Sequence, residues 1–186
     1  MRIIKLGGSL LSSQVLPACL DYVAELPGQT LLVPGGGIFA DQVRSLQSVY
    51  QFNDISAHRM AVLAMQQMAL LFNGLKPNFS IYNSIYAPCN WQGVAVWSAN
   101  IKELDTEGIT NSWDITSDSL AAWLAYYLHA SALIVVKAAS IDPTASTLQL
   151  QQQGIVDAGF NQFAKQLCCP VHIINKDRFL TTSCLI

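Results

Sequence analysis

The sequence predicts an α/β protein in which a mainly parallel sheet is covered by helices on both faces, as a three-layer αβα sandwich. Short apolar segments alternate with amphipathic helical segments, which is typical of parallel strands joined by crossover helices. Residues 132–137 are apolar until a final lysine, as expected for a central strand buried on both faces. Two further strand segments, residues 2–6 and 30–33, run directly into glycine loops and then helices.

Length and composition indicate a single globular domain and argue against some classes of partner. The chain has 186 residues, of which 52% are hydrophobic and 12% are charged. This length predicts one domain over residues 1–186, with enough apolar residues for a sizeable core. The sparse charge favours a homo-oligomer, because apolar surface is best hidden in an interface. A net charge of -2, with ten lysines and arginines, argues against nucleic acid or an anionic membrane as a partner.

The cysteines and the N-terminus point to a cytoplasmic protein. The N-terminus lacks the apolar region of a signal peptide, and no apolar stretch reaches the roughly 18 residues that a membrane span needs. An odd number of cysteines without a Cys-x-x-Cys pair favours neither a disulfide framework nor a zinc site. We expect reduced, mostly buried thiols. The cysteines are Cys19, Cys89, Cys168, Cys169 and Cys184.

Glycine and proline mark the first two strand–helix units. The strand at 2–6 ends before Gly7-Gly8, and the helix that follows has apolar residues at helical spacing until Pro27-Gly28 stops it. The strand at 30–33 ends in a second glycine loop. An amphipathic helix over residues 38–46 follows that loop.

The middle of the chain begins with a third helix. Asn53 or Asp54 can cap it, and its apolar pattern continues to about residue 73. Residues 78–82 and 93–97 are typical of strands. Residues 102–108 are polar, so we expect a surface turn there.

The last third contains the strongest signals. Residues 116–118, Thr-Ser-Asp, are suited to the cap and first turn of a helix over 120–128. The central strand at 132–137 follows. The remaining segments are predicted to be a polar loop at 140–153, a helix capped near Asp157 and a final strand at 170–175.

Polar features gather where the predicted strands end, and ligands of such sheets bind at the carboxyl ends of the strands. Two of the six lysines end highly apolar strands, where an unpaired ammonium is costly to bury. The alternative is that each lysine extends to the surface. Glycine-loop amides and ammonium groups together suit a bound phosphate. The features are Lys5 with Gly7, Gly8 and Ser9, then Gly35, Gly36 and Gly37, then Thr116, Ser117 and Asp118, and finally Lys137.

Phosphoryl transfer is the chemistry that fits this pattern. Its transition state spreads negative charge over the transferring group, so catalysis is mostly positioning and electrostatic stabilisation. A lysine and one set of amides can hold nucleotide phosphates, and the second glycine loop can hold the acceptor. Asp118 can fix the positions of the lysines without acting as a base.

Other functions compete with this interpretation. Gly35-x-Gly37-x-x-Ala40 matches a dinucleotide-binding fingerprint, with Asp54 at about the right distance downstream. That would make the protein a dinucleotide-dependent oxidoreductase. However, Asp54 precedes a helix instead of ending a strand, and the motif leaves Lys5 unexplained. A Walker A motif is absent from the sequence.

Four segments resemble the amino acid kinase family, which includes aspartate, acetylglutamate, uridylate and isopentenyl phosphate kinases. Residues 5–9 are similar to its Lys-x-Gly-Gly-Ser opening, and residues 33–37 to its second glycine loop. Residues 116–122 resemble its Thr-x-Asp-x-x-Ala segment. Residues 136–142 resemble the Lys-Ala-x-x-Val-Asp stretch of its uridylate-kinase branch. The segments come in the family's order and cover nearly the whole chain.

The resemblance implies a kinase that uses ATP and Mg2+. It implies that Lys5 stabilises the transferring phosphoryl group and that Asp118 organises the lysines. A member without activity could instead act as a regulatory or binding subunit. The implied nucleotide-binding residues are Lys5, Gly7, Gly8, Ser9, Lys137 and Asp142. The implied acceptor-binding residues are Gly35, Gly36, Gly37, Thr116 and Ser117.

Residues 56–65 narrow the resemblance to one branch. They are similar to the small kinases of methanofuran biosynthesis, a cofactor pathway of one-carbon metabolism. Those enzymes phosphorylate an (aminomethyl)furan-methyl phosphate to its diphosphate. The resemblance makes Arg59 and His58 candidates for contact with the acceptor phosphate.

Overall fold

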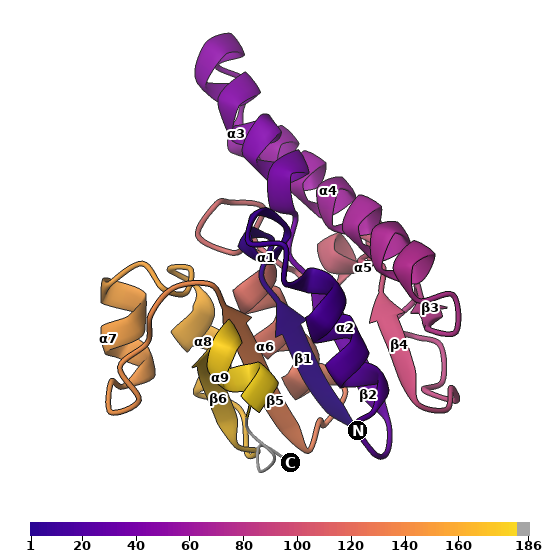
Figure 1. Ribbon diagram of the computed structural model, residues 1–186. Helices are drawn as coiled ribbons and strands as arrows, with labels where there is room; N and C mark the ends of the chain where they lie inside the picture. Colours follow the sequence, from indigo (N-terminus) through magenta and orange to yellow (C-terminus); the bar gives the residue numbers. More distant parts are fainter. Residues whose placement is uncertain (182–186) are drawn as a thin grey trace.

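The structure, a computed structural model, describes residues 1–181. In this range six strands form one sheet in the order β3-β4-β2-β1-β5-β6, and each neighbouring pair is parallel (Figure 1). The predicted parallel sheet is therefore confirmed. The strands are β1 (Arg2–Leu6), β2 (Thr30–Pro34), β3 (Ser80–Tyr82), β4 (Val94–Trp97), β5 (Ala132–Lys137) and β6 (Val171–Asn175).

Helices connect the strands and cover both faces of the sheet (Figure 1). α6 and α8 belong to the hydrophobic cluster that contains Ile3 and Leu133, whereas α2 and α9 cover Ile4 and Ile134 on the opposite face. The three-layer αβα prediction is confirmed. The helices are α1 (Ser9–Ser12), α2 (Leu16–Ala24), α3 (Gly37–Tyr50), α4 (Asp54–Leu75), α5 (Ile101–Thr106), α6 (Ser117–Tyr127), α7 (Thr147–Gln152), α8 (Phe160–Ala164) and α9 (Lys176–Thr181).

The direction of Lys5 follows from its place in β1. Side chains alternate between the faces of a strand, so Lys5 lies on the same face as Ile3. That is the face covered by α6. The first turn of α6 contains Asp118, so the alternation of β1 directs the lysine toward a carboxylate.

Three segments differ from the sequence-based expectation. The first helix is broken into α1 and α2 by a turn in which Gln14 has a φ of 55°. The predicted surface turn at 102–108 largely forms α5, which Asn100 caps and Leu104 anchors in the core. The predicted loop at 140–153 contains α7, which is stabilised by a capping box at Ser146 and by burial of Leu150. In each short helix, a cap and one buried side chain outweigh the polar composition.

The helices of residues 1–181 include none that is long and apolar enough to cross a membrane. The cysteines in this range are free thiols, but only Cys19 is buried. Cys89 and Cys169 are partly buried, and Cys168 is exposed, so the expectation of mostly buried thiols is wrong for the described cysteines. Cys184 lies outside the described residues.

Candidate active site

The two glycine loops meet at the carboxyl ends of β1 and β2. A Cβ atom on Gly8 would lie 2.3 Å from the backbone of Gly37, and one on Gly35 would lie 2.6 Å from the nitrogen of Gly8. Any side chain at either position would therefore force the loops apart. Gly37 also has a φ of 55°, which favours glycine. The glycines thus bring two segments of backbone into direct contact.

This contact leaves several backbone donors available to a ligand. Within residues 1–181, the N–H groups of Gly8, Ser9, Gly36 and Gly37 donate to no protein acceptor. All four residues line one cavity. By contrast, the N–H of Gly7 donates to the carbonyl of Val136 at 3.2 Å, so Gly7 closes the turn. Clustered, unpaired backbone N–H groups form an anion-binding site.

Asp118 joins the two predicted lysines at the centre of the site. Its Oδ1 lies 2.7 Å from Nζ of Lys5, and its Oδ2 lies 2.6 Å from Nζ of Lys137. The side chains of Lys5 and Asp118 are 4% and 5% exposed, whereas that of Lys137 is 18% exposed. The structure therefore brings Lys5 of β1 to residues of α6 and β5 that lie more than 100 positions further along the chain.

The charges of this centre control its protonation. Burial alone raises the pKa of Asp118, but the ammonium groups of Lys5 and Lys137 outweigh burial and hold that pKa below its usual range. Burial, reinforced by repulsion from Lys5, lowers the pKa of Lys137, and Asp118 opposes the change. Asp118 is consequently an ionised partner for two cations and a poor general base.

Asp157 is a functional candidate that sequence reasoning missed, because it was interpreted as the cap of the following helix. Instead, it caps α6 from outside. Its Oδ2 accepts from the N–H and hydroxyl of Thr116 at 2.9 and 2.7 Å and from the N–H of Ser119 at 3.1 Å, while Oδ1 accepts from the Ser119 hydroxyl. Burial, followed by repulsion from Asp118, raises the pKa of Asp157. Asp157 fixes the turn that presents Asp118.

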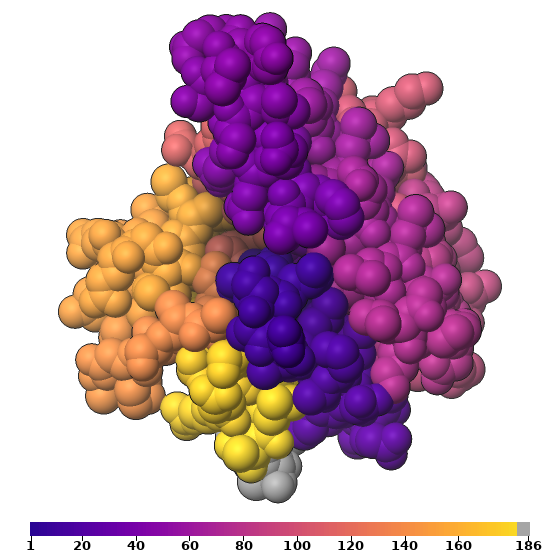
Figure 2. Space-filling view, turned by 45° about the horizontal axis from the view of Figure 1, so that its top comes forward, coloured from indigo at the N-terminus to yellow at the C-terminus, as the bar shows by residue number. Residues whose placement is uncertain are grey.

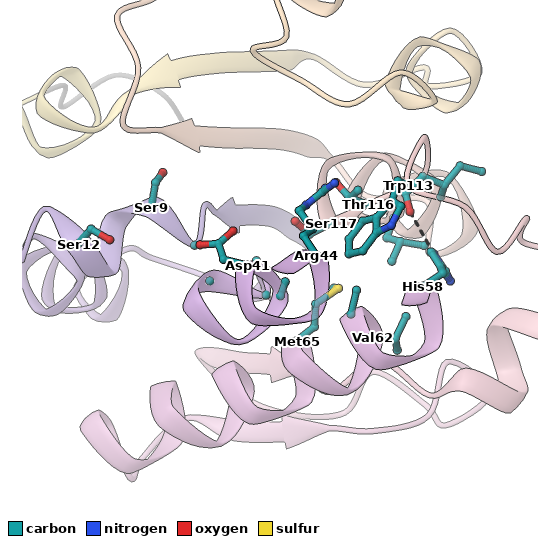
Figure 3. A pocket seen from close by; sticks show the side chains of 18 residues that line it. Ser9, Ser12, Asp41, Arg44, His58, Val62, Met65, Trp113, Thr116 and Ser117 are labelled. Atoms are coloured by element: carbon teal, nitrogen blue, oxygen red, sulfur yellow. Dashed lines mark hydrogen bonds between the residues drawn. The ribbon is translucent and has the colours of Figure 1, made fainter. Parts of the chain in front are cut away.

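A cavity of about 260 Å3 lies beside this centre, between α1, α3, α4 and the segment before α6. Figure 2 looks toward this end of the molecule, where the surface is hollowed between purple α3, the indigo N-terminal region and the orange residues around α7 and α8. Apolar side chains of α4 and α6 form part of the wall, as Figure 3 shows for Val62 and Met65. Of the predicted site residues, Gly8, Ser9, Gly35, Gly36, Gly37, His58, Thr116 and Ser117 line it.

The structure does not place Arg59 among the residues that line this cavity. Its Nη2 donates to Oδ2 of Asp105 at 2.8 Å, and its side chain is 48% exposed. His58 does line the cavity, but both its ring nitrogens have protein partners, Asn111 Oδ1 at 3.1 Å and the carbonyl of Ile115 at 3.0 Å. His58 therefore ties α4 to the loop before α6 and has no free nitrogen for an acceptor.

Arg44 of α3 does line the cavity, and sequence reasoning missed it. Its guanidinium carbon lies 3.7 Å from the ring centroid of Trp113. The indole nitrogen of Trp113 in turn donates to Oε1 of Gln47 at 2.6 Å. A cation stacked on tryptophan has its in-plane donors directed away from the ring. The local sequence around Arg44 gave no signal of this contact, because Trp113 lies in a distant segment of the chain.

A second cavity, of about 440 Å3, adjoins the centre. Asp118, Lys137 and Asp157 line it together with Arg44, so Arg44 borders both cavities. Asp142 does not line it. The Asp142 carboxylate accepts from the N–H and hydroxyl of Thr144, which lowers its pKa, and it borders a separate hollow near β6.

The donor set fits nucleotide phosphates better than a metal cage. Free amides and two ammonium groups are suitable ligands for phosphate. Within residues 1–181 no cluster of three histidine, cysteine, aspartate or glutamate side chains could hold a metal ion. The carboxylate oxygens of Asp118 and Asp157 are engaged by lysines and by the α6 turn. Mg2+ would therefore be held chiefly by phosphates and water.

Two comparisons of the sequence with known proteins gave matches. The profile of a family described as "Amino acid kinase family" matches residues 1–140. A [5-(aminomethyl)furan-3-yl]methyl phosphate kinase of Methanocaldococcus jannaschii is 26% identical over 139 residues, which are 73% of this chain and 64% of that protein. The matched segment thus spans less than two thirds of that relative.

Solved structures share the fold. Uridylate kinase from Archaeoglobus fulgidus superposes with a TM-score of 0.68 at 18% identity, covering 96% of this chain and 93% of that one. UMP kinase from Bacillus anthracis gives a TM-score of 0.65 at 18% identity, and the superposition covers 95% of this chain and 87% of that one. At this identity the likeness shows the fold alone.

Proposed function

The chain belongs to the amino acid kinase family, and from that premise we propose that it is an ATP-dependent kinase that phosphorylates a small phosphate monoester. The observation that carries the proposal is the buried Lys5–Asp118–Lys137 centre, of which Asp118 and Lys137 line the second cavity. Ser117, which precedes Asp118 in the chain, lines the first cavity. One cavity offers free amides, and the other borders Lys137. In this proposal the phosphoryl group is transferred near the Lys5–Asp118–Lys137 centre, at the boundary of the two cavities. We take residues 1–186 to act as one kinase domain.

Each residue of the centre has a separate task in this proposal. Lys5 neutralises charge that develops on the transferring group, and Lys137 binds nucleotide phosphate. Asp118 holds both ammonium groups at fixed positions and takes no proton. Asp157 holds the α6 turn. ATP would supply the phosphoryl group, and the Mg2+ bound with it would supply additional positive charge.

The phosphoryl-transfer centre and His58 offer no free base, which favours an acceptor that is already ionised. Asp118 has a lowered pKa and two cationic partners, and both nitrogens of His58 are engaged. A phosphate monoester loses its second proton with a pKa of about 6, so its oxygen can attack at neutral pH without a base. An alcohol acceptor would require proton removal.

The relative's acceptor also fits the wall of the first cavity. [5-(Aminomethyl)furan-3-yl]methyl phosphate combines a phosphate with a flat ring. The amides of the glycine loops suit the phosphate, and Val62, Met65 and Leu120 provide apolar surface for a ring. We therefore propose this compound, or a close analogue, as the acceptor.

A homo-oligomer is part of the same proposal. α3 and α4 project beyond the sheet in Figure 1 and carry exposed apolar side chains. Val49, Tyr50 and Leu70 are 71%, 72% and 66% exposed. Light scattering on the purified protein is expected to give at least twice the monomer mass of 20.3 kDa. A strictly monomeric protein would contradict this part.

Two experiments separate the kinase from its rivals. In a thermal-shift assay, Mg-ATP should stabilise the protein and NAD should not, because ligands stabilise the folded state that binds them. Stabilisation by NAD alone would instead support an oxidoreductase built on Gly35, Gly37 and Ala40. ADP release should depend on an acceptor from a panel of small phosphates and amino acids. A protein that binds Mg-ATP but phosphorylates none of them would favour the regulatory-subunit alternative.

A further inference from the structure

We propose that Asp41 and Arg44 of α3 form a two-charge recognition pair that selects an acceptor carrying an ammonium group as well as a phosphate. The inference rests on the proposed kinase function and deepens it, because it names the class of acceptor and the residues that recognise it. Asp41 has had no role in the phosphoryl-transfer centre described above.

The two side chains are close but do not neutralise each other. They lie one turn apart on α3 and line the same cavity. Side chains three positions apart on a helix are neighbours and commonly pair. Nevertheless, no ion pair joins Asp41 to Arg44, and the Asp41 carboxylate has no hydrogen-bond donor within residues 1–181. Both charges therefore remain available to a ligand.

Arg44 is placed to bind the phosphate. Trp113 holds its guanidinium in a stacked position, and Gln47 fixes the Trp113 ring from the next turn of α3. In the view of Figure 3 the guanidinium lies toward Trp113 and Thr116. Arg44 also borders the cavity that contains Lys137. A phosphate at this boundary would meet a planar, pre-oriented donor beside the transfer centre.

The carboxylate of Asp41 favours an acceptor that carries a positive charge. The charged side chains that line the first cavity are Asp41 and Arg44, and His58 is the remaining titratable group there. In Figure 3 Asp41 lies between Ser9 and Arg44. An acceptor with only a phosphate would bring its negative charge next to an uncompensated carboxylate, which is unfavourable. An acceptor with an ammonium group would turn that repulsion into attraction.

The rest of the cavity suits the portion between the two charges. Val62, Met65 and Leu120 form apolar surface alongside the charged face of α3. The cavity therefore presents one anion, one cation and an apolar wall. A phosphate monoester with a primary amine on a short apolar or aromatic body satisfies all three.

Calorimetric titration with two acceptors that differ in one group tests the pair. The probes are [5-(aminomethyl)furan-3-yl]methyl phosphate and its 5-(hydroxymethyl) analogue, which has nearly the same size but no positive charge. The unsubstituted protein should bind the amino compound about tenfold more tightly, the ratio expected for one favourable charged contact. Equal affinity for the two compounds, or failure to bind the amino compound, would overturn the proposal.

Two variants test which side chain recognises the ammonium group and which recognises the phosphate. Asp41→Asn should reduce the preference to less than about twofold by weakening only the amino compound. Arg44→Gln should weaken both compounds by about tenfold or more and keep their ratio. Asp114→Asn is the matched control, because it removes an exposed carboxylate that does not line this cavity. The Asp114→Asn variant should prefer the amino compound over the hydroxymethyl compound by the same ratio as the unsubstituted protein.

Other results with these variants would contradict the proposal. If Asp41→Asn weakens both compounds alike, or raises only the Mg2+ concentration needed for binding, the carboxylate does not recognise ammonium and the proposal is overturned. Unchanged affinity of Arg44→Gln for both compounds would remove the guanidinium from the pair. The kinase function is judged separately by ADP release. If no ADP is released, the kinase proposal fails, but the titrations still decide whether Asp41 and Arg44 recognise the amino compound.

Discussion

The proposed phosphoryl-transfer centre and the first cavity, which we propose as the acceptor site, differ in how their charges are arranged. At the centre, Lys5, Asp118 and Lys137 are largely buried and paired with one another, and Asp157 fixes the turn beneath them. In the cavity, Asp41 and Arg44 are exposed and form no ion pair in the described part of the chain, although Arg44 stacks on Trp113. A transferring phosphoryl group is the same for every acceptor, so its partners can be fixed in advance. Charges that recognise one acceptor must remain open until it binds.

Loss of Lys5 should have the largest effect. Lys5→Ala is expected to lower kcat by about 10²–10³, because a pre-positioned charge that acts on the transition state is removed. ADP release at saturating ATP and acceptor measures this value. Lys165→Ala, at an exposed position of the surface, should leave kcat within about twofold. If Lys5→Ala turns over at the rate of the unsubstituted protein, the centre is not catalytic.

Asp118→Asn should affect both stability and turnover. Removing the carboxylate leaves two buried ammonium groups without their shared partner, which costs about 3 kcal/mol of unfolding free energy. Denaturant unfolding measures that loss. Among molecules that remain folded, kcat should fall by about 10-fold or more because the lysines lose their fixed positions. A variant with normal stability and turnover would show that Asp118 organises neither lysine.

The pKa of Lys137 predicts a change at alkaline pH. Because burial and Lys5 lower this pKa, the ammonium loses its proton at a pH below the ordinary lysine value of about 10.4. Binding of nucleotide phosphate, followed as kcat/KM for ATP, should therefore decline as pH rises through the lowered pKa. Lys137→Arg should move this decline to higher pH, because arginine keeps its charge. An identical profile in the variant would assign the decline to another group.

Arg59→Gln should have the smallest effect, and it contrasts directly with Arg44. Arg59 forms an exposed ion pair with Asp105, a type of contact worth about 0–1 kcal/mol. We expect KM for the acceptor to change by less than about twofold. The sequence-based expectation of an acceptor contact requires a larger increase in KM. Steady-state kinetics with varied acceptor decides between the two.

The features that were predictable from sequence are those with a strong local signal. Continuous apolar runs identified the strands, and a lysine at the end of such a run, as in Lys5 and Lys137, was conspicuous because its burial needs a partner. The glycine loops were recognisable because close backbone contact excludes side chains. That Asp118 fixes the positions of both lysines was also expected, from its predicted place at the same edge of the sheet and from the family resemblance.

The features that were missed depend on contacts between distant segments. Asp157 caps α6 across 41 positions of sequence, so its local context suggested only its own helix. The position of the Arg44 guanidinium depends on its contact with Trp113, which belongs to a loop far away in sequence. Arg59 and Arg44 are both helix-surface arginines in the sequence. Only the packing of α3 against α4 determines which of them lines the cavity.

The central claim is that the chain joins a phosphoryl group to an existing phosphate. Phosphorus NMR of the protein with Mg-ATP and [5-(aminomethyl)furan-3-yl]methyl phosphate tests it most directly. The account predicts loss of the monoester signal and growth of two mutually coupled signals of a new diphosphate, together with ADP. Release of inorganic phosphate with the monoester unchanged would contradict it.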